Sequence, residues 1–279
     1  MSRSLVLAEQ FPHSAVANAL WEHRADRDAL LASLLAFLQA DPRVRAAWLW
    51  GSFGRNEADD LSDLDLWIVI AEESSSAFGL SVRRYAEQTG SFISGAEKPH
   101  LGPLGGGYFG SLHEGRHGLL HLDCYWQPQS AEVVVPEHAV LLERLAEPAL
   151  PFPLLSVPHI PNRIQGETEV ENGLGFAWLM FSIAAKYLAR DPNSDLGLML
   201  YAREGLEKAI ALLGQSDALT LDWSVPDVPL AKSERLRRLV SVADQAAEAA
   251  NAQGLSISLR NAPCLFRYLD MVEAVLTGR

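Results

Sequence analysis

Two aspartates one residue apart are the clearest sign of chemistry in this chain. Asp63 and Asp65 open the segment DLDLWIVI, which continues as a run of bulky apolar residues. Alternate side chains of a strand share a face, so both carboxylates would point the same way. Like charges that close repel unless a cation lies between them, and a hard divalent cation such as Mg²⁺ suits carboxylate oxygens. The spacing therefore predicts a metal site at the start of a buried strand. A solvated charged loop is the plainer alternative.

A third carboxylate lies in a second strand-like segment, LLHLDCYW. In a strand, alternate side chains lie on opposite faces. One face would carry His121, Asp123 and Tyr125, and the other Leu120, Leu122, Cys124 and Trp126. If this strand neighbours the first, Asp123 joins Asp63 and Asp65. Three carboxylates would hold two metal ions, and a pair of ions about 3.5–4 Å apart promotes in-line phosphoryl or nucleotidyl transfer. We expect all three aspartates to be catalytic metal ligands.

A Gly-Ser pair stands upstream of the aspartates, at the end of the apolar run VRAAWLWGS. Gly51 would let the backbone approach a phosphate closely, and Ser52 would offer a hydroxyl and an amide. Alone, the pair would indicate only a turn. Together with Asp63 and Asp65 it predicts a phosphate cradle beside the metal site.

The stretch GSFGRNEADDLSDLDLWIV resembles the signature of the DNA polymerase β-type nucleotidyltransferase superfamily. The shared features are Gly-Ser, two residues, Arg, a spacer, and Ser-Asp-x-Asp before an apolar strand. In style it is similar to bacterial aminoglycoside and lincosamide nucleotidyltransferases. The resemblance covers about residues 44–71, and HLDCYW supplies the later acidic strand. Asn56 stands where family members often have glycine, but asparagine also tolerates left-handed geometry.

The resemblance implies Mg²⁺-dependent transfer of a nucleoside monophosphate, expected to be AMP, from ATP or another nucleoside triphosphate to a hydroxyl. Pyrophosphate would be released. The acceptor is expected to be a small molecule such as an aminoglycoside-like antibiotic, and an endogenous metabolite or a protein hydroxyl fits equally. Asp63 and Asp65 would bind metal. Gly51 and Ser52 would bind the triphosphate. Arg55 fits a phosphate contact or a surface salt bridge equally, and Lys186 in the helical half fits a triphosphate contact or plain surface charge equally.

The general base has several candidates. Asp123 is the first, because it would lie beside the metal site. Related antibiotic enzymes often draw an acid from outside the metal strands, so Glu167, Glu169 and Glu171 are also candidates. Acidic residues at a helix start also complement the helix dipole, which explains the three glutamates without catalysis.

Two further motifs give weaker evidence for a binding site. GGGYFG, residues 105–110, has the G-x-G-x-x-G spacing but precedes a strand, so we interpret it as a flexible loop and not a dinucleotide site. His113, His117 and His121 approach a metal-binding spacing, but they straddle an expected turn, so a hairpin is preferred to a zinc site.

Composition limits the possible partners. The net charge of −12 repels polyanions, which argues against long nucleic acid and against RNA tailing, and is compatible with a cationic small molecule. Two cysteines are too few for a disulfide framework. No apolar run reaches the ~20 residues that span a bilayer, so we expect a cytoplasmic protein without a membrane partner.

The elements that must position these residues indicate an α+β protein of two domains. Residues 1–150 would form a nucleotidyltransferase mixed sheet with flanking helices, including a helix over 14–40, a helix over 79–90 and a hairpin turning near Glu114 to Gly118. Five prolines between 148 and 161 mark the boundary. Residues 151–279 would form an all-α bundle, with helices over 167–190, 195–214, 231–250 and 262–277.

A function of another class keeps the same fold. The chain could be a non-catalytic nucleotide-binding regulator of the toxin-antitoxin or sensor type. The intact pair Asp63 and Asp65 argues against this alternative, because a regulator has no need of two metal-binding carboxylates.

Overall fold

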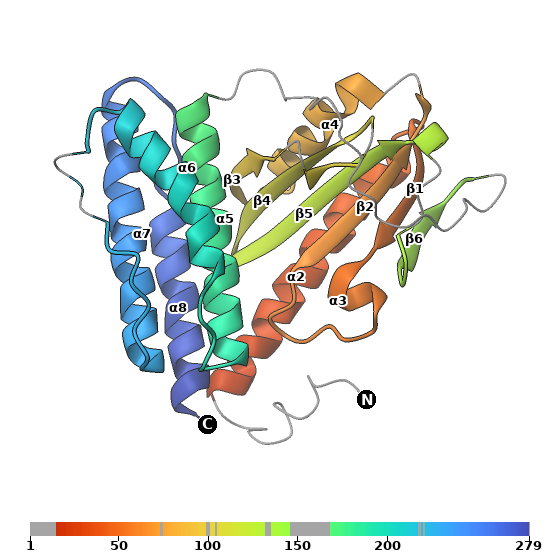
Figure 1. The fold of residues 1–279 in the computed structure, drawn as a ribbon. Coiled ribbons are helices and arrows are strands. Elements are labelled where there is room, and N and C mark those ends of the chain that lie inside the picture. Colours follow the sequence, from red (N-terminus) through yellow and green to blue (C-terminus); the bar gives the residue numbers. More distant parts are fainter. Residues whose placement is uncertain are drawn as a thin grey trace.

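The structure is a computed structural model that describes residues 15–72, 75–98, 101–103, 105–131, 135–145, 168–216, 219 and 221–278. Its centre is a six-stranded sheet with strand order β3-β4-β5-β2-β1-β6 (Figure 1). The strands are β1 Val44–Leu49, β2 Leu64–Ile70, β3 Phe92–Glu97, β4 Gly107–Gly115, β5 Gly118–Pro128 and β6 Ala139–Glu143. Neighbouring strands are antiparallel except β2 and β5, which run parallel.

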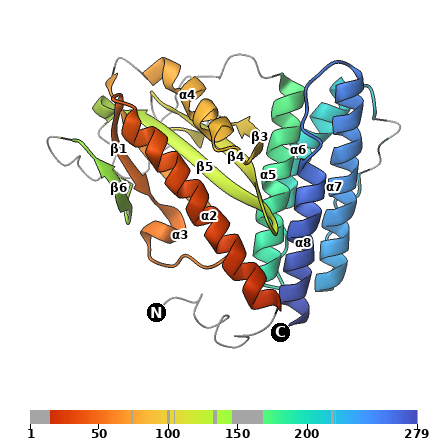
Figure 2. The same ribbon diagram turned by 180° about the vertical axis from the view of Figure 1, so that it is seen from behind.

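Two helices cover one face of this sheet, as Figure 2 shows: α2 Ala15–Ala40 and α4 Ser75–Gln88. Leu30, Leu34 and Leu38 recur at helical spacing along α2 and are buried. They pack with the inward side chains of β2, which are Leu64, Leu66, Ile68 and Ile70. The alternation in DLDLWIVI therefore directs its aliphatic residues toward α2 and α4, and leaves its carboxylates for the other face.

The other face meets a bundle of four helices, α5 Glu169–Arg190, α6 Leu198–Leu212, α7 Pro229–Ala252 and α8 Asn261–Thr277 (Figure 1). Ile93, Ala96, Leu112 and Leu119 of the sheet share one apolar cluster with these helices. The start of α5 has a capping box in which Thr168 and Glu171 satisfy each other's backbone N–H groups. The bundle thus covers the β3-β4 side of the sheet and ends beside β2 and β5.

The expected α+β class, the mixed sheet and the C-terminal helices are confirmed. The hairpin is also confirmed, since Gly115 pairs with Gly118. Asn56 has a φ of 55°, as its left-handed tolerance allows. The boundary at 150/151 and the prolines from 148 to 161 lie outside the described residues.

Two features differ from expectation. The interpretation of residues 105–110 as a flexible loop is wrong from Gly107 on, because β4 begins there. A methyl group on Gly107 would lie 2.3 Å from the Trp126 ring, so glycine here allows close strand packing. Strands β3 and β6 were not expected; both are edge strands, which pair on one side only and carry a weak pattern.

A search of the described helices finds no segment with the length and apolarity needed to cross a membrane.

Candidate active site

The register of two parallel strands brings the acidic residues together. In the β2–β5 pair, Asp65 stands opposite Asp123, and Leu64 stands opposite Leu122. Asp63 immediately precedes β2, so its side chain leaves on the same side as that of Asp65. Asp123 is only 8% exposed. The three carboxylates therefore gather on the sheet face away from α2 and α4, where the sequence predicted them.

The turn after β1 packs against these carboxylates. Gly51 has a φ of +64°, and a methyl group at its Cα would lie 2.2 Å from Oδ2 of Asp65. Both the backbone angle and the contact require glycine. Gly51–Gly54 then form the single turn α3. The buried Ser52 Oγ finds no hydrogen-bond partner in the described part of the chain.

Two arginines from distant helices hold the loop that delivers Asp63. Arg27 of α2 donates to the carbonyls of Asp59 and Ser62, at 2.8 and 3.1 Å. Arg190 of α5 donates to both carboxylate oxygens of Asp59, at 2.8 and 2.6 Å, and to Ser62 Oγ at 3.1 Å. Because charge-assisted bonds from both sides fix this loop, Asp63 enters the site in one orientation.

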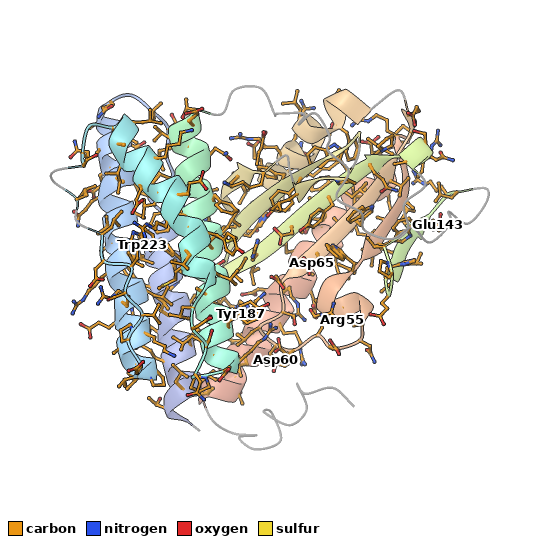
Figure 3. All side chains as sticks on the ribbon, in the orientation of Figure 1. Arg55, Asp60, Asp65, Glu143, Tyr187 and Trp223 are labelled. Atoms are coloured by element: carbon orange, nitrogen blue, oxygen red, sulfur yellow. The ribbon has the colours of Figure 1, made fainter. Side chains whose placement is uncertain are left out.

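Three further side chains complete the polar group. Lys186 Nζ of α5 lies 2.5 Å from Asp63 Oδ2. His121 lies between two carboxylates, with Nδ1 3.7 Å from Asp63 Oδ2 and Nε2 3.0 Å from Asp123 Oδ1. The Tyr108 hydroxyl donates to Asp123 Oδ1 at 2.6 Å. Figure 3 shows Asp65 on the sheet, between α5, which carries Tyr187, and α3, which Arg55 follows.

Burial and neighbouring charges shift the pKa values of these groups. Burial, together with the nearby Asp63 and Asp123, raises the pKa of Asp65 to about 8. Burial would also raise the pKa of Asp63, but Lys186 and His121 lower it to about 2. Burial lowers the pKa of His121, yet Asp123 and Asp63 raise it overall. Asp65 therefore keeps its proton because of burial and its acidic neighbours, and a bound cation would lower its pKa.

The residues fit a divalent ion. Asp63, His121 and Asp123 each offer one ligand atom, and these atoms all lie within 4.8 Å of one another. Oxygen and imidazole nitrogen are ordinary ligands of divalent metals. Asp65, whose carboxylate adjoins Gly51 at the end of β1, supplies the acid on the side of the Gly-Ser turn.

Other predicted residues lie elsewhere. Arg55 is exposed and ion-paired with Glu57 at 2.9 Å, so the surface salt bridge is observed and its phosphate role remains a prediction. Lys186 is buried, which excludes plain surface charge. Glu169 and Glu171 lie at the start of α5, roughly 22–26 Å along the helix from Lys186 at 1.5 Å per residue, so they do not join the site. Glu167 lies outside the described residues.

The sequence reasoning missed four residues of the site or its support: Arg27, Tyr108, His121 and Arg190. For His121 a signal existed, because alternation placed it on the face of Asp123. The two arginines and Tyr108 gave none, since each acts through contacts with residues far away in sequence or on a neighbouring strand.

Comparison with known families agrees with this geometry. The model of the family described as polymerase beta, nucleotidyltransferase, matches residues 33–91, which include Gly51, Ser52, Asp63 and Asp65. Residues 33–91 belong to the polymerase beta nucleotidyltransferase family. The match supports a nucleotidyltransferase activity in general terms. Asp123, His121 and Lys186 lie outside the matched part of this nucleotidyltransferase, and only the tertiary structure adds them. A comparison with curated proteins gives no match.

Proposed function

We propose that this nucleotidyltransferase moves a nucleoside monophosphate, with AMP as the first candidate, from a triphosphate to a hydroxyl of a small molecule, with release of pyrophosphate. The observation that carries the proposal is the register of Asp65 with Asp123, which adds a third carboxylate to the family motif. Three acids on one sheet face suit the two Mg²⁺ ions that such a transfer uses.

Asp63, Asp65 and Asp123 would hold the ions. When bound, the ions lower the pKa of the acceptor hydroxyl and neutralise charge on the triphosphate. A bound cation would favour the ionised form of Asp65, because a positive charge opposes the effect of its acidic neighbours.

The triphosphate would lie along the turn after β1. Gly51 leaves room for close approach of the phosphates to the backbone, and the unpartnered Ser52 Oγ offers a donor. Lys186, which reaches the site from α5, would contact the phosphates once a cation replaces it at Asp63. Arg55 would assist from the end of α3.

Asp123 is the proposed general base. Its two described contacts, from Tyr108 and His121, both use Oδ1. Oδ2 is therefore the oxygen that can face the ion and the acceptor's proton. The Tyr108 hydroxyl donates to Oδ1 and fixes the carboxylate plane, which keeps Oδ2 in position.

The net charge supports one acceptor class. The net charge of −12 would attract a cationic, hydroxylated molecule, so an aminoglycoside-like antibiotic is the first candidate and antibiotic resistance the corresponding role. We place the reaction in the cytoplasm, where ATP is available.

A direct test incubates the full chain with Mg²⁺, each of four labelled nucleoside triphosphates, and pools of aminoglycosides and hydroxylated metabolites. The expected result is an acceptor heavier by one nucleoside monophosphate, with pyrophosphate released in equal amount. Asp63→Asn should abolish the product, whereas Asp227→Asn, at an exposed acid, should not.

Two results would contradict the proposal. Turnover that survives Asp63→Asn would place the chemistry elsewhere. Tight binding of triphosphate in calorimetry, with no consumption across all the pools, would favour the non-catalytic regulator.

A further inference from the structure

His121 is the feature of the site that the expected all-carboxylate chemistry does not use. It lies two residues before Asp123 on β5 and projects from the same face. It is 8% exposed, and its Nδ1 is buried without a hydrogen-bond partner among the residues described. A buried, unpartnered nitrogen is costly, so its place in a native site needs a ligand to explain it.

The contacts of His121 fix which nitrogen is available. Nε2 lies 3.0 Å from Asp123 Oδ1, and because a carboxylate oxygen only accepts, Nε2 is the nitrogen that donates in this contact. Nδ1 lies 3.7 Å from Asp63 Oδ2 and is the nitrogen left to bind a metal, which takes the neutral form of the imidazole. Histidines that bind metals ordinarily donate their other N–H to a carboxylate, which sets the tautomer and the ring orientation. His121 has this arrangement, with Asp123 as the orienting group.

Lys186 supports the position of a cation. Its ammonium lies 2.5 Å from Asp63 Oδ2, the same oxygen that His121 Nδ1 faces. A positive charge therefore already lies at the Asp63 oxygen that His121 Nδ1 faces. A divalent ion bound there would exchange with the ammonium group and release Lys186.

We infer that His121 Nδ1 is a metal ligand, and that with Asp63 it makes one ion position selective for a first-row transition metal ion, for which Mn²⁺ is the probe, over Mg²⁺. The inference rests on the proposed function only for the role of the ion in transfer. Mg²⁺ binds oxygen ligands almost exclusively, whereas imidazole nitrogen favours the later divalent metals. One imidazole among carboxylates therefore shifts the preference of this position.

The test uses metal-stripped full-length protein and substoichiometric Mn²⁺, without nucleotide. Pulsed electron paramagnetic resonance should detect ¹⁴N coupling to the bound Mn²⁺, and labelling histidine with ¹⁵N should change that coupling. Calorimetry should give tighter binding of Mn²⁺ than of Mg²⁺. His121→Asn should remove the nitrogen signal and weaken Mn²⁺ binding by more than the ~10–100-fold cost of losing an outer partner.

The matched control is His117→Asn, because His117 lies in the hairpin turn with its Nε2 on Glu22. It should keep both the coupling and the affinity. If His121→Asn does not fold, as judged by circular dichroism, the wild-type nitrogen signal still decides.

The outcomes separate this inference from the proposed function. Mn²⁺ bound without nitrogen coupling, in a protein that transfers a nucleoside monophosphate, overturns the inference alone. Failure to bind either ion, together with no transfer, overturns both.

Discussion

At the scale of the residue, Asp65 carries the strongest electrostatic conflict in the site. Its carboxyl is buried beside Asp63 and Asp123, and these causes together raise its pKa to about 8 from an ordinary 3.8. Lys186 contacts Asp63 and not Asp65. The ion-free protein therefore keeps an acid whose charged form is poorly tolerated, which is a property suited to binding cations and not to stability.

This conflict predicts a pH-dependent effect of Asp65→Asn. Below about pH 3.8 the carboxyl is protonated in both folded and unfolded chains; between 3.8 and about 8 only the unfolded chain releases the proton. The wild type thus loses stability as pH rises through this range, and the amide does not titrate. Without divalent ions, the melting temperature of Asp65→Asn minus that of the wild type should therefore increase from pH 4 to pH 8.

The same variant should lose nucleotidyl transfer by more than about 100-fold, the upper cost of losing an outer partner of a metal. Asp227→Asn, at an exposed carboxylate, is the control and should change neither property. If the difference in melting temperature between Asp65→Asn and the wild type does not change with pH, the pKa of Asp65 is not raised in the folded protein.

At the scale of the element, the loop over residues 59–62 connects three distant parts of the chain. Arg27 holds its backbone from α2, and Arg190 holds its side chains from α5. The loop has little regular structure of its own, so these bonds replace the ladder that would otherwise fix it. Its last residue precedes Asp63, and any motion of the loop moves that carboxylate.

Arg190→Gln should therefore reduce both stability and catalysis. The change removes the paired bonds to Asp59, and we expect a loss of about 1–3 kcal/mol in the free energy of unfolding, measured by urea denaturation. Transfer should be slower even at saturating triphosphate, because the displaced Asp63 lowers the rate of the reaction and does not only weaken substrate binding.

The control is Arg203→Gln, an exposed arginine of α6 paired with Glu207 one helical turn away. Exposed pairs of this kind contribute about 0.3–0.5 kcal/mol, so this variant should be close to the wild type. Equal effects from both arginines would mean that the loop does not depend on Arg190.

At the scale of the whole molecule, the site depends on how the bundle packs against the sheet. Lys186 and Asp63 are 123 residues apart in sequence. Their contact requires α5 to lie close to β3, and Gly175 makes that approach possible: a methyl group there would lie 2.2 Å from the carbonyl oxygen of Gly95. The sheet supplies acids and the bundle supplies the cation that opposes them.

Gly175→Ala should push α5 away from β3. We expect a loss of about 1–3 kcal/mol in the free energy of unfolding, as for other overpacked contacts. Transfer should also slow, because Lys186 and Arg190 belong to the same helix as Gly175. Gly197→Ala is the control, because the added methyl group would meet only the Asp195 side chain, at 3.3 Å. An unchanged transfer rate in a destabilised Gly175→Ala protein would show that the site tolerates movement of the bundle.

The sequence by itself determined the features that depend on local pattern. The spacing of Asp63 and Asp65, the alternation around Asp123 and the periodicity of the C-terminal helices are properties of short segments, and each predicted its element. The Gly-Ser turn was equally readable, because φ and close approach at Gly51 restrict the residue type directly.

Only the tertiary structure decided which of these segments meet. The parallel register of Asp65 with Asp123, the position of His121 between two carboxylates, and the arrival of Lys186 from α5 depend on packing between segments far apart in sequence. The same packing keeps Glu169 and Glu171 at the far end of α5. The local sequence pattern determines which side chains share a face of a helix or strand. Which other element packs against that face depends on the burial of apolar surface over the whole chain.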